Sequence, residues 1–206
     1  MDSNQISDQL DQQFLIIIVP AILAAAALLL WANRERIRTR YAEWRTERCL
    51  NSIGVDQIRH FVCPDGLDGQ FKIGRLALTP NAIVLISHKR YAGRIYCAER
   101  IAEWTQVIEQ KSFKFENPLF ELENQITAIK LLTGTQAING YLFFNQGASF
   151  PKGHPESVLL QDNIPENLLS NHIATTPIQP AVQKIWDYLK TIKNNRLEES
   201  STGAKT

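Results

Sequence analysis

The sequence predicts an α/β protein with a mixed central sheet flanked by helices, preceded by one N-terminal transmembrane helix. Three observations predict this class: an uncharged run at residues 14–32, a series of short β-like runs separated by Pro and Gly turns, and segments with 3.6-residue apolar spacing. The chain has 206 residues, of which 44% are hydrophobic and 21% charged, as in globular proteins. The part after the apolar run suits one domain with one core.

Residues 14–32 are expected to cross a membrane. The 19 residues contain no charged side chain, and at ~1.5 Å per residue they would reach ~28 Å, close to a hydrocarbon core of ~30 Å. A cleaved secretory signal normally opens with positive charge, whereas this chain opens with three aspartates. A buried soluble helix is rarely apolar on every side. We therefore expect a membrane anchor.

The flanking charges predict the orientation of this anchor. Six arginines lie within residues 33–50, and no Lys or Arg precedes residue 33. Because the positive flank stays inside, the N-terminus is expected outside and the folded domain in the cytoplasm, at the inner or plasma membrane. The expected organisation is an extracytoplasmic tail at 1–13, a transmembrane helix at 14–32, a basic juxtamembrane linker at 33–40, a folded domain at 41–193 and a polar tail at 194–206.

The folded domain shows a recognisable order of elements. A helix is expected over 34–53, which lacks Gly and Pro, with Gly54 as its stop. Turn residues then separate strands expected at 57–63, 70–78, 82–88 and 93–97. Asn117-Pro118 predicts the start of a helix that continues to 133. Two short strands at 142–144 and 158–160 and a final helix at 179–193 complete the domain.

Composition excludes several classes of function. A net charge of +1 is unlike that of proteins that coat DNA. Three widely spaced cysteines form no disulfide framework or zinc motif, and the four histidines show no metal-ligand spacing. Cys97 lacks a neighbouring base and is interpreted as a small buried apolar residue. These features fit a reduced compartment.

Three motifs in order give a family resemblance. AIVLISHKRYAGRIY occupies residues 82–96, Trp104-Thr105-Gln106 follows, and FKFENPL occupies 113–119. They resemble the nuclease-related domain (NERD) family, a branch of the PD-(D/E)xK nuclease-like superfamily, over roughly residues 41–170. The most specific parts are Lys89-x-Tyr91-x-Gly93-x-Ile95, Trp104 and Asn117-Pro118. The resemblance implies a restriction-endonuclease-like fold and metal-dependent cleavage of phosphodiesters.

The resemblance also implies which positions form the site. Ala42-Glu43 matches the family's Gly-Glu pair, and Lys89 matches its lysine, so Glu43 and Lys89 are the retained catalytic positions. Gly74 stands where an Asp is usual, and Ser87 where Glu or Gln is usual. In the following helix Glu121 stands where Gln is usual and Gln125 where His is usual.

These departures remove the chemistry of a metal site. Phosphodiester hydrolysis needs a hard divalent ion held by carboxylates, while the lysine stabilises the developing charge. Gly74 offers no ligand and Ser87 only a neutral hydroxyl, so Glu43 alone would hold Mg²⁺ weakly. Asp65 and Asp68 are interpreted as turn residues, since even Asp68 lies ~20 Å from Gly74 along an extended strand. We expect a degenerate site without a cofactor, or with Mg²⁺ if an enzyme survives.

Three functions stay open. The leading hypothesis is a membrane-anchored interaction module for nucleic acid or protein, with phosphate contacts from Lys89, Arg90 and Arg94. The alternatives are an active metal-dependent endonuclease in DNA processing, and a structural subunit of a membrane assembly that pairs with protein partners or with itself. Strand alternation places His88 on the face opposite Lys89. The alternating Phe113 and Phe115 either stack bases or, as is commoner, fill the core from a strand.

Overall fold

The computed structural model describes residues 3–64 and 69–202, with side chains described for residues 20, 22, 24, 25, 27–63 and 69–195. The chain divides into two compact units, Met1–Arg45 and Thr46–Thr206. The turn aspartates Asp65 and Asp68 lie outside the described residues, as do the side chains of the expected N-terminal tail at 1–13.

One long helix, α1 (Ser3–Asn51), occupies the first unit and enters the second. Residues 33–40, expected as a linker, are helical, because the chain has no Gly or Pro between Pro20 and Gly54 and is rich in strong helix formers. Among the described residues, no helix has the length and apolar character needed to cross a membrane. The expected span at 14–32 includes positions 14–19, 21, 23 and 26, whose side chains lie outside that description.

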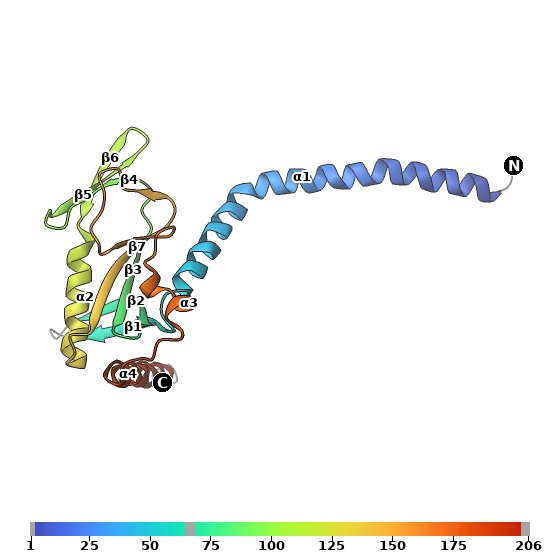
Figure 1. The fold of residues 1–206 in the computed structure, drawn as a ribbon. Coiled ribbons are helices and arrows are strands. Elements are labelled where there is room, and N and C mark those ends of the chain that lie inside the picture. Colours follow the sequence, from blue (N-terminus) through green and yellow to red (C-terminus); the bar gives the residue numbers. More distant parts are fainter. Residues whose placement is uncertain (1–2, 65–68, 203–206) are drawn as a thin grey trace. The chain divides into compact units, whose positions relative to one another are not determined.

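A five-stranded mixed sheet forms the centre of the second unit, which confirms the expected α/β class with helices beside a mixed sheet. Its strands run in the order β1 (Asp56–Pro64), β2 (Gln70–Leu78), β3 (Ile83–Lys89), β7 (Ile138–Phe144) and β9 (Val158–Leu160). The first three are antiparallel, whereas β7 and β9 run parallel to β3. The parallel step from β3 to β7 needs a crossover, which contains α2 (Pro118–Thr133) on one face of the sheet (Figure 1).

Apolar residues alternate between the two faces of this sheet. In β3, Ile83 and Leu85 belong to the core cluster that includes Leu122 of α2. Val84 and Ile86 belong to a second cluster, with Leu50 near the end of α1. Both faces of the sheet are therefore covered, which explains why the first four residues of β3 form an unbroken apolar run.

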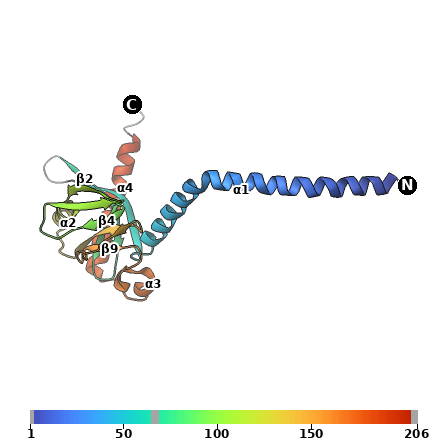
Figure 2. The same ribbon diagram turned by 90° about the horizontal axis from the view of Figure 1, so that it is seen from above.

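A second sheet of four strands departs from the expectation of one sheet. Its strands β4, β5 and β6 are labelled in Figure 1, and β4 again in Figure 2. It contains β6 (Lys111–Glu116), β5 (Glu103–Ile108), β4 (Gly93–Tyr96) and β8 (Ala148–Ser149), in that order. Trp104 of β5 is fully buried and packs on Phe144 and Phe115. Phe115 thus contributes to the core, whereas Phe113 is exposed.

Asn117 joins this second sheet to α2. Its Oδ1 accepts a hydrogen bond from the backbone N–H of Leu119 at 3.0 Å, which caps the helix. Its Nδ2 donates to the carbonyl oxygens of Glu99 and Ile101 at 2.9 and 2.8 Å. The Asn117-Pro118 motif is therefore a structural corner of the fold.

Three helical segments close the chain: η1 (Glu166–Leu168), α3 (Ser170–Ile173) and α4 (Pro180–Thr202). The first two were not expected from the sequence. The last helix begins one residue after its expected start and continues beyond 193. Its Trp186 is buried, and the indole Nε1 donates to Asp56 Oδ2 at 3.0 Å, which fixes α4 against β1.

Candidate functional site

A pocket opens where β2 and β3 separate. The two strands pair from Arg75–Ile86 to Leu78–Ile83, whereas the earlier part of β2 pairs with β1 and the end of β3 pairs with β7. A cavity of about 460 Å³ lies at this opening. It is lined by Glu47, Leu50, Arg59, His60, Lys72, Gly74, Arg75, Ile86, Ser87, His88, Lys89, Glu121 and Gln125.

Three of the positions expected to form the site line this one pocket: Gly74, Ser87 and Lys89. The Lys89 side chain is only 17% exposed, and its Nζ lies 2.7 Å from Glu121 Oε2. Gln125 Nε2 donates to Glu121 Oε1 at 3.1 Å. Glu121 therefore holds Lys89 directly, and Gln125 in turn orients the Glu121 carboxylate.

The carboxylate that reaches the pocket from α1 is Glu47 rather than Glu43. Glu43 is exposed and belongs to the first unit, and it is absent from the lining residues of the pocket. Glu47 follows one helical turn later and lines the cavity. The role predicted for Glu43 stays a prediction, but the structure brings a different glutamate to Lys89's pocket.

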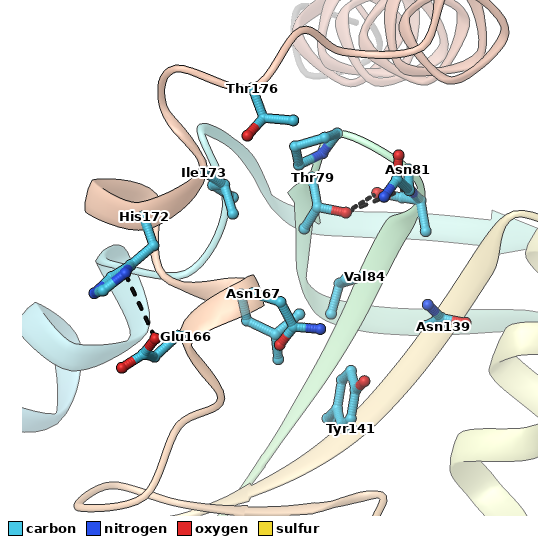
Figure 3. Close-up of a pocket in the computed structure, with 13 residues that line it drawn as sticks. Thr79, Asn81, Val84, Asn139, Tyr141, Glu166, Asn167, His172, Ile173 and Thr176 are labelled. Carbon is cyan, nitrogen blue, oxygen red and sulfur yellow. Dashed lines mark hydrogen bonds and ion pairs between the residues drawn. The ribbon is translucent and has the colours of Figure 1, made fainter.

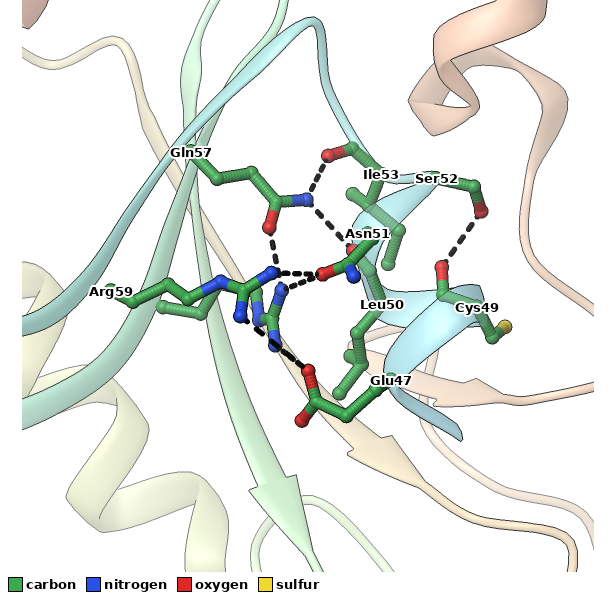
Figure 4. Close-up of polar contacts among 9 residues, drawn as sticks. Glu47, Cys49, Leu50, Asn51, Ser52, Ile53, Gln57 and Arg59 are labelled. Atoms are coloured by element: carbon green, nitrogen blue, oxygen red, sulfur yellow. Dashed lines mark hydrogen bonds and ion pairs between the residues drawn. The ribbon is translucent and has the colours of Figure 1, made fainter. Parts of the chain in front are cut away.

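Arg75 binds the last turn of α1 to this pocket. Its side chain is 8% exposed, and Nη2 donates to Glu47 Oε2 at 2.8 Å. Nη1 donates to Asn51 Oδ1 at 2.7 Å and to Gln57 Oε1 at 2.6 Å. Asn51 Oδ1 also accepts from Arg59, whose Nη1 lies 3.9 Å from Glu47 (Figure 4). The sequence analysis missed this network, which joins residues far apart in the chain.

Gln57 completes the network at the helix end. Its Nε2 donates to the carbonyl oxygens of Leu50 and Ile53 at 2.8 and 2.6 Å (Figure 4). Carbonyls at the end of a helix lack an intrahelical partner, so an amide donor stabilises them. Gln57 therefore orients Arg75 and caps α1 at the same time.

The pocket has the charge of an anion site. Among the described residues that line it, four are cationic (Arg59, Lys72, Arg75 and Lys89) and two are acidic (Glu47 and Glu121). Each carboxylate is already paired with a cation, Glu47 with Arg75 and Glu121 with Lys89. In the described part of the chain no group of three or more His, Cys, Asp or Glu is placed to hold a metal ion.

His88 contributes no positive charge to this pocket near neutral pH. Burial and then the nearby Arg90 lower the pKa of its imidazole, and Glu47 only partly opposes them. Its Nε2 is buried without a hydrogen-bond partner among the described residues. The ring meets Phe143 edge-on, on the face opposite Glu121, as strand alternation predicts. His88 nevertheless lines the same pocket as Lys89, which corrects the expectation that only one of them would reach it.

Space does not explain the absence of an acid at position 74. A Cβ added to Gly74 would lie 4.0 Å from the carbonyl oxygen of Ile86, its nearest neighbour outside the adjoining residues of the chain. That distance is an ordinary contact, and the backbone of Gly74 is outside the left-handed region. An aspartate would therefore fit where glycine stands.

The other predicted contact residues lie outside the pocket lining. Arg90 follows β3 directly and is exposed, and Arg94 is exposed on β4 of the second sheet. The thiol of Cys97 is half-buried, which raises its pKa to about 11 and keeps it protonated. Of the expected nucleic-acid contacts, Lys89 alone lines the cavity.

A second hollow of about 500 Å³ lies at the other end of β3 (Figure 3). The turn at Thr79–Ala82, β7, η1 and α3 surround it, and its rim carries Glu166 and His172, 3.8 Å apart. Asn139, Tyr141 and Asn167 also line it. None of the residues expected to form the site lies here, and its polar groups are mainly uncharged.

Comparison with known proteins identifies the family. The nuclease-related domain family matches residues 38–145, just over half of the chain. An uncharacterized protein of Bacillus anthracis is 32% identical over 65 residues, which are 32% of this chain and 31% of that protein. The match thus spans about a third of the relative's length, and no solved structure matches. The chain belongs to the nuclease-related domain family.

Proposed function

We propose that this protein is a membrane-anchored member of the family that binds nucleic acid without cleaving it. The observation that carries the proposal is the pocket at Lys89, where four cations outnumber two carboxylates that are both ion-paired. A divalent ion is held by free carboxylates, whereas a phosphate is held by Arg and Lys. The pocket therefore favours binding of a nucleic-acid phosphate over binding of the metal ion that phosphodiester cleavage requires.

Lys89 has a binding role in this proposal rather than a catalytic one. In a nuclease site the lysine stabilises charge on a phosphate that a metal activates. Here its ammonium is paired with Glu121 at 2.7 Å, so an incoming phosphate would compete with that carboxylate. Arg90 and Arg94, both exposed, extend the positive charge along the surface beyond the pocket.

A fluorescence anisotropy assay on the full-length chain in mild detergent tests the nucleic-acid part. We expect salt-sensitive binding of DNA oligonucleotides in EDTA, weakened about fivefold by Lys89→Gln, since one phosphate contact is worth ~1 kcal/mol. Glu121→Gln is expected to strengthen binding, because it frees Lys89. Lys111→Gln, an exposed lysine of β6, is the matched control and should change nothing.

Cleavage is measured in parallel with plasmid DNA and Mg²⁺ or Mn²⁺. No nicking is expected above the background of the Lys89→Gln variant. Metal-dependent nicking lost in that variant and in Glu47→Gln would instead establish the endonuclease alternative, with Glu47 as a metal ligand. Absence of both binding and nicking would leave a structural or protein-binding role.

The membrane anchor is the second part of the proposal. Its support is the uncharged run at 14–32 and the arginines that follow it. In addition, the four consecutive residues Leu28, Leu29, Leu30 and Trp31 are all more than 60% exposed on α1. Because a helical turn has 3.6 residues, these four side chains point outward all around the helix. A lipid bilayer is the environment that surrounds an apolar helix on every side.

Membrane fractionation with alkaline extraction tests the anchor. The chain is expected in the pellet, and the double variant Ala24→Arg/Leu28→Arg in the supernatant, because each arginine costs ~2.5–3.5 kcal/mol within the bilayer. Ile37→Arg, beyond the expected span, is the control and should stay in the pellet. Protease added outside spheroplasts should leave the C-terminal domain intact; digestion would reverse the proposed orientation.

A further inference from the structure

We propose that the pocket at Lys89 recognises the terminal phosphate monoester of a nucleic-acid strand rather than a phosphate within the strand. This inference rests on the proposed function, since it assumes that the pocket binds nucleic acid. It specifies which phosphate enters: the one at a chain end.

The shape of the pocket is the first argument. Residues from five elements line it: the last turns of α1, β1, β2, β3 and α2. A volume of about 460 Å³ lies within the range of small-molecule sites, about 300–1,000 Å³. A hollow of this volume has room for a terminal phosphate group.

Charge is the second argument. The four cations and two carboxylates of the lining give a formal charge of +2. A phosphate monoester carries about −1.5 to −2 at pH 7, whereas a phosphodiester within a strand carries a single charge. The monoester therefore neutralises the pocket more completely.

Unused hydrogen-bonding groups are the third argument. Within the described part of the chain, the side chains of His60, Lys72 and Ser87 line the pocket and have no hydrogen-bond or ion-pair partner. A monoester has three terminal oxygens that accept hydrogen bonds, one more than a diester. The pocket thus offers more donors than an internal phosphate can use.

The backbone conformation of His60 is the fourth argument. Its φ of 54° lies in the left-handed region, which is unfavourable for a non-glycine residue. His60 lies on β1 opposite Gly74, between the pairs Arg59–Arg75 and Phe61–Ile73. Such strain concentrates at functional sites, and here it accompanies an imidazole at the pocket.

The test compares four single-stranded DNA oligonucleotides of one sequence, bound to the full-length protein in mild detergent. Three are linear and carry a 5′-phosphate, a 3′-phosphate or hydroxyls at both ends, and the fourth is circular. We expect one phosphorylated form to bind about tenfold more tightly than the hydroxyl and circular forms. Lys72→Gln is expected to reduce this ratio, and Lys111→Gln to leave it unchanged.

Each outcome separates the two proposals. Equal binding of all four DNAs would overturn end recognition and leave the proposed function standing, whereas binding of none would overturn both. A nucleoside monophosphate should compete with the phosphorylated DNA better than glycerol 3-phosphate, which represents a lipid headgroup. Equal competition by glycerol 3-phosphate would overturn the assignment to nucleic acid.

Discussion

We expect the double variant Gly74→Asp/Ser87→Glu to convert the cationic pocket into a divalent metal site. The two added carboxylates bring the formal charge of the lining from +2 to zero and supply the oxygen ligands that Mg²⁺ and Mn²⁺ prefer. Position 74 has room for a side chain, with 4.0 Å to the Ile86 carbonyl oxygen. We predict a Kd for Mn²⁺ on the order of 10⁻⁴–10⁻³ M, the range of weak carboxylate sites.

Isothermal titration calorimetry measures this gain directly. The unchanged chain and the neutral double variant Gly74→Asn/Ser87→Gln should show no saturable heat, although the latter has nearly the same shape as the acidic variant. DNA binding should weaken in the acidic variant, because its pocket repels phosphate. If the acidic and neutral variants bind Mn²⁺ equally, the missing carboxylates are not the reason why the pocket lacks a metal site.

The second large effect is expected from Trp104→Ala, which should lower the free energy of unfolding by about 3–5 kcal/mol. Trp104 is fully buried, packs on Phe144 and Phe115, and donates from Nε1 to the Ala98 carbonyl oxygen at 3.0 Å. The alanine would leave a cavity between the two sheets and an unpaired carbonyl group. In thermal unfolding, each kcal/mol corresponds to ~2–4 °C for a chain of this size.

A second tryptophan provides the matched control. Trp44 lies on α1 and is 54% exposed, so Trp44→Ala is expected to change stability by less than about 1 kcal/mol. If the Trp104→Ala variant had the same melting temperature as the Trp44→Ala variant, the second sheet would contribute little to the stability of the fold. That result would remove Trp104 as the residue that couples the two sheets.

The central sheet was predictable because its signals are local. The apolar run of β3 and the Pro80-Asn81 turn before it both lie within ten residues. Strand alternation then decides which of these side chains pack on each face of the sheet. The hairpin of β5 and β6 was not predicted, because Glu109 makes its turn with a φ of 54°. A glutamate in that conformation gives none of the Gly or Asn signals by which turns are recognised.

The site was only partly predictable, for a geometric reason. Glu43 and Glu47 precede the buried Leu50 by seven and three residues, so helical periodicity places both on the same side of α1. They differ by about 6 Å along the axis, and tertiary packing decides which of them meets the pocket. Arg75 was missed for a similar reason: its three acceptors lie 18 to 28 residues away in the chain.

The positions of the pocket's arginines depend on the last turns of α1. Two of the three groups that hold Arg75, Glu47 and Asn51, belong to the final turns of α1, and Asn51 holds Arg59 as well. If tension along the helix unwound those turns, both guanidinium groups would lose these acceptors together. The freed guanidinium groups would attract anions more strongly, so the affinity of the pocket for anions depends on whether the last turns of α1 stay helical.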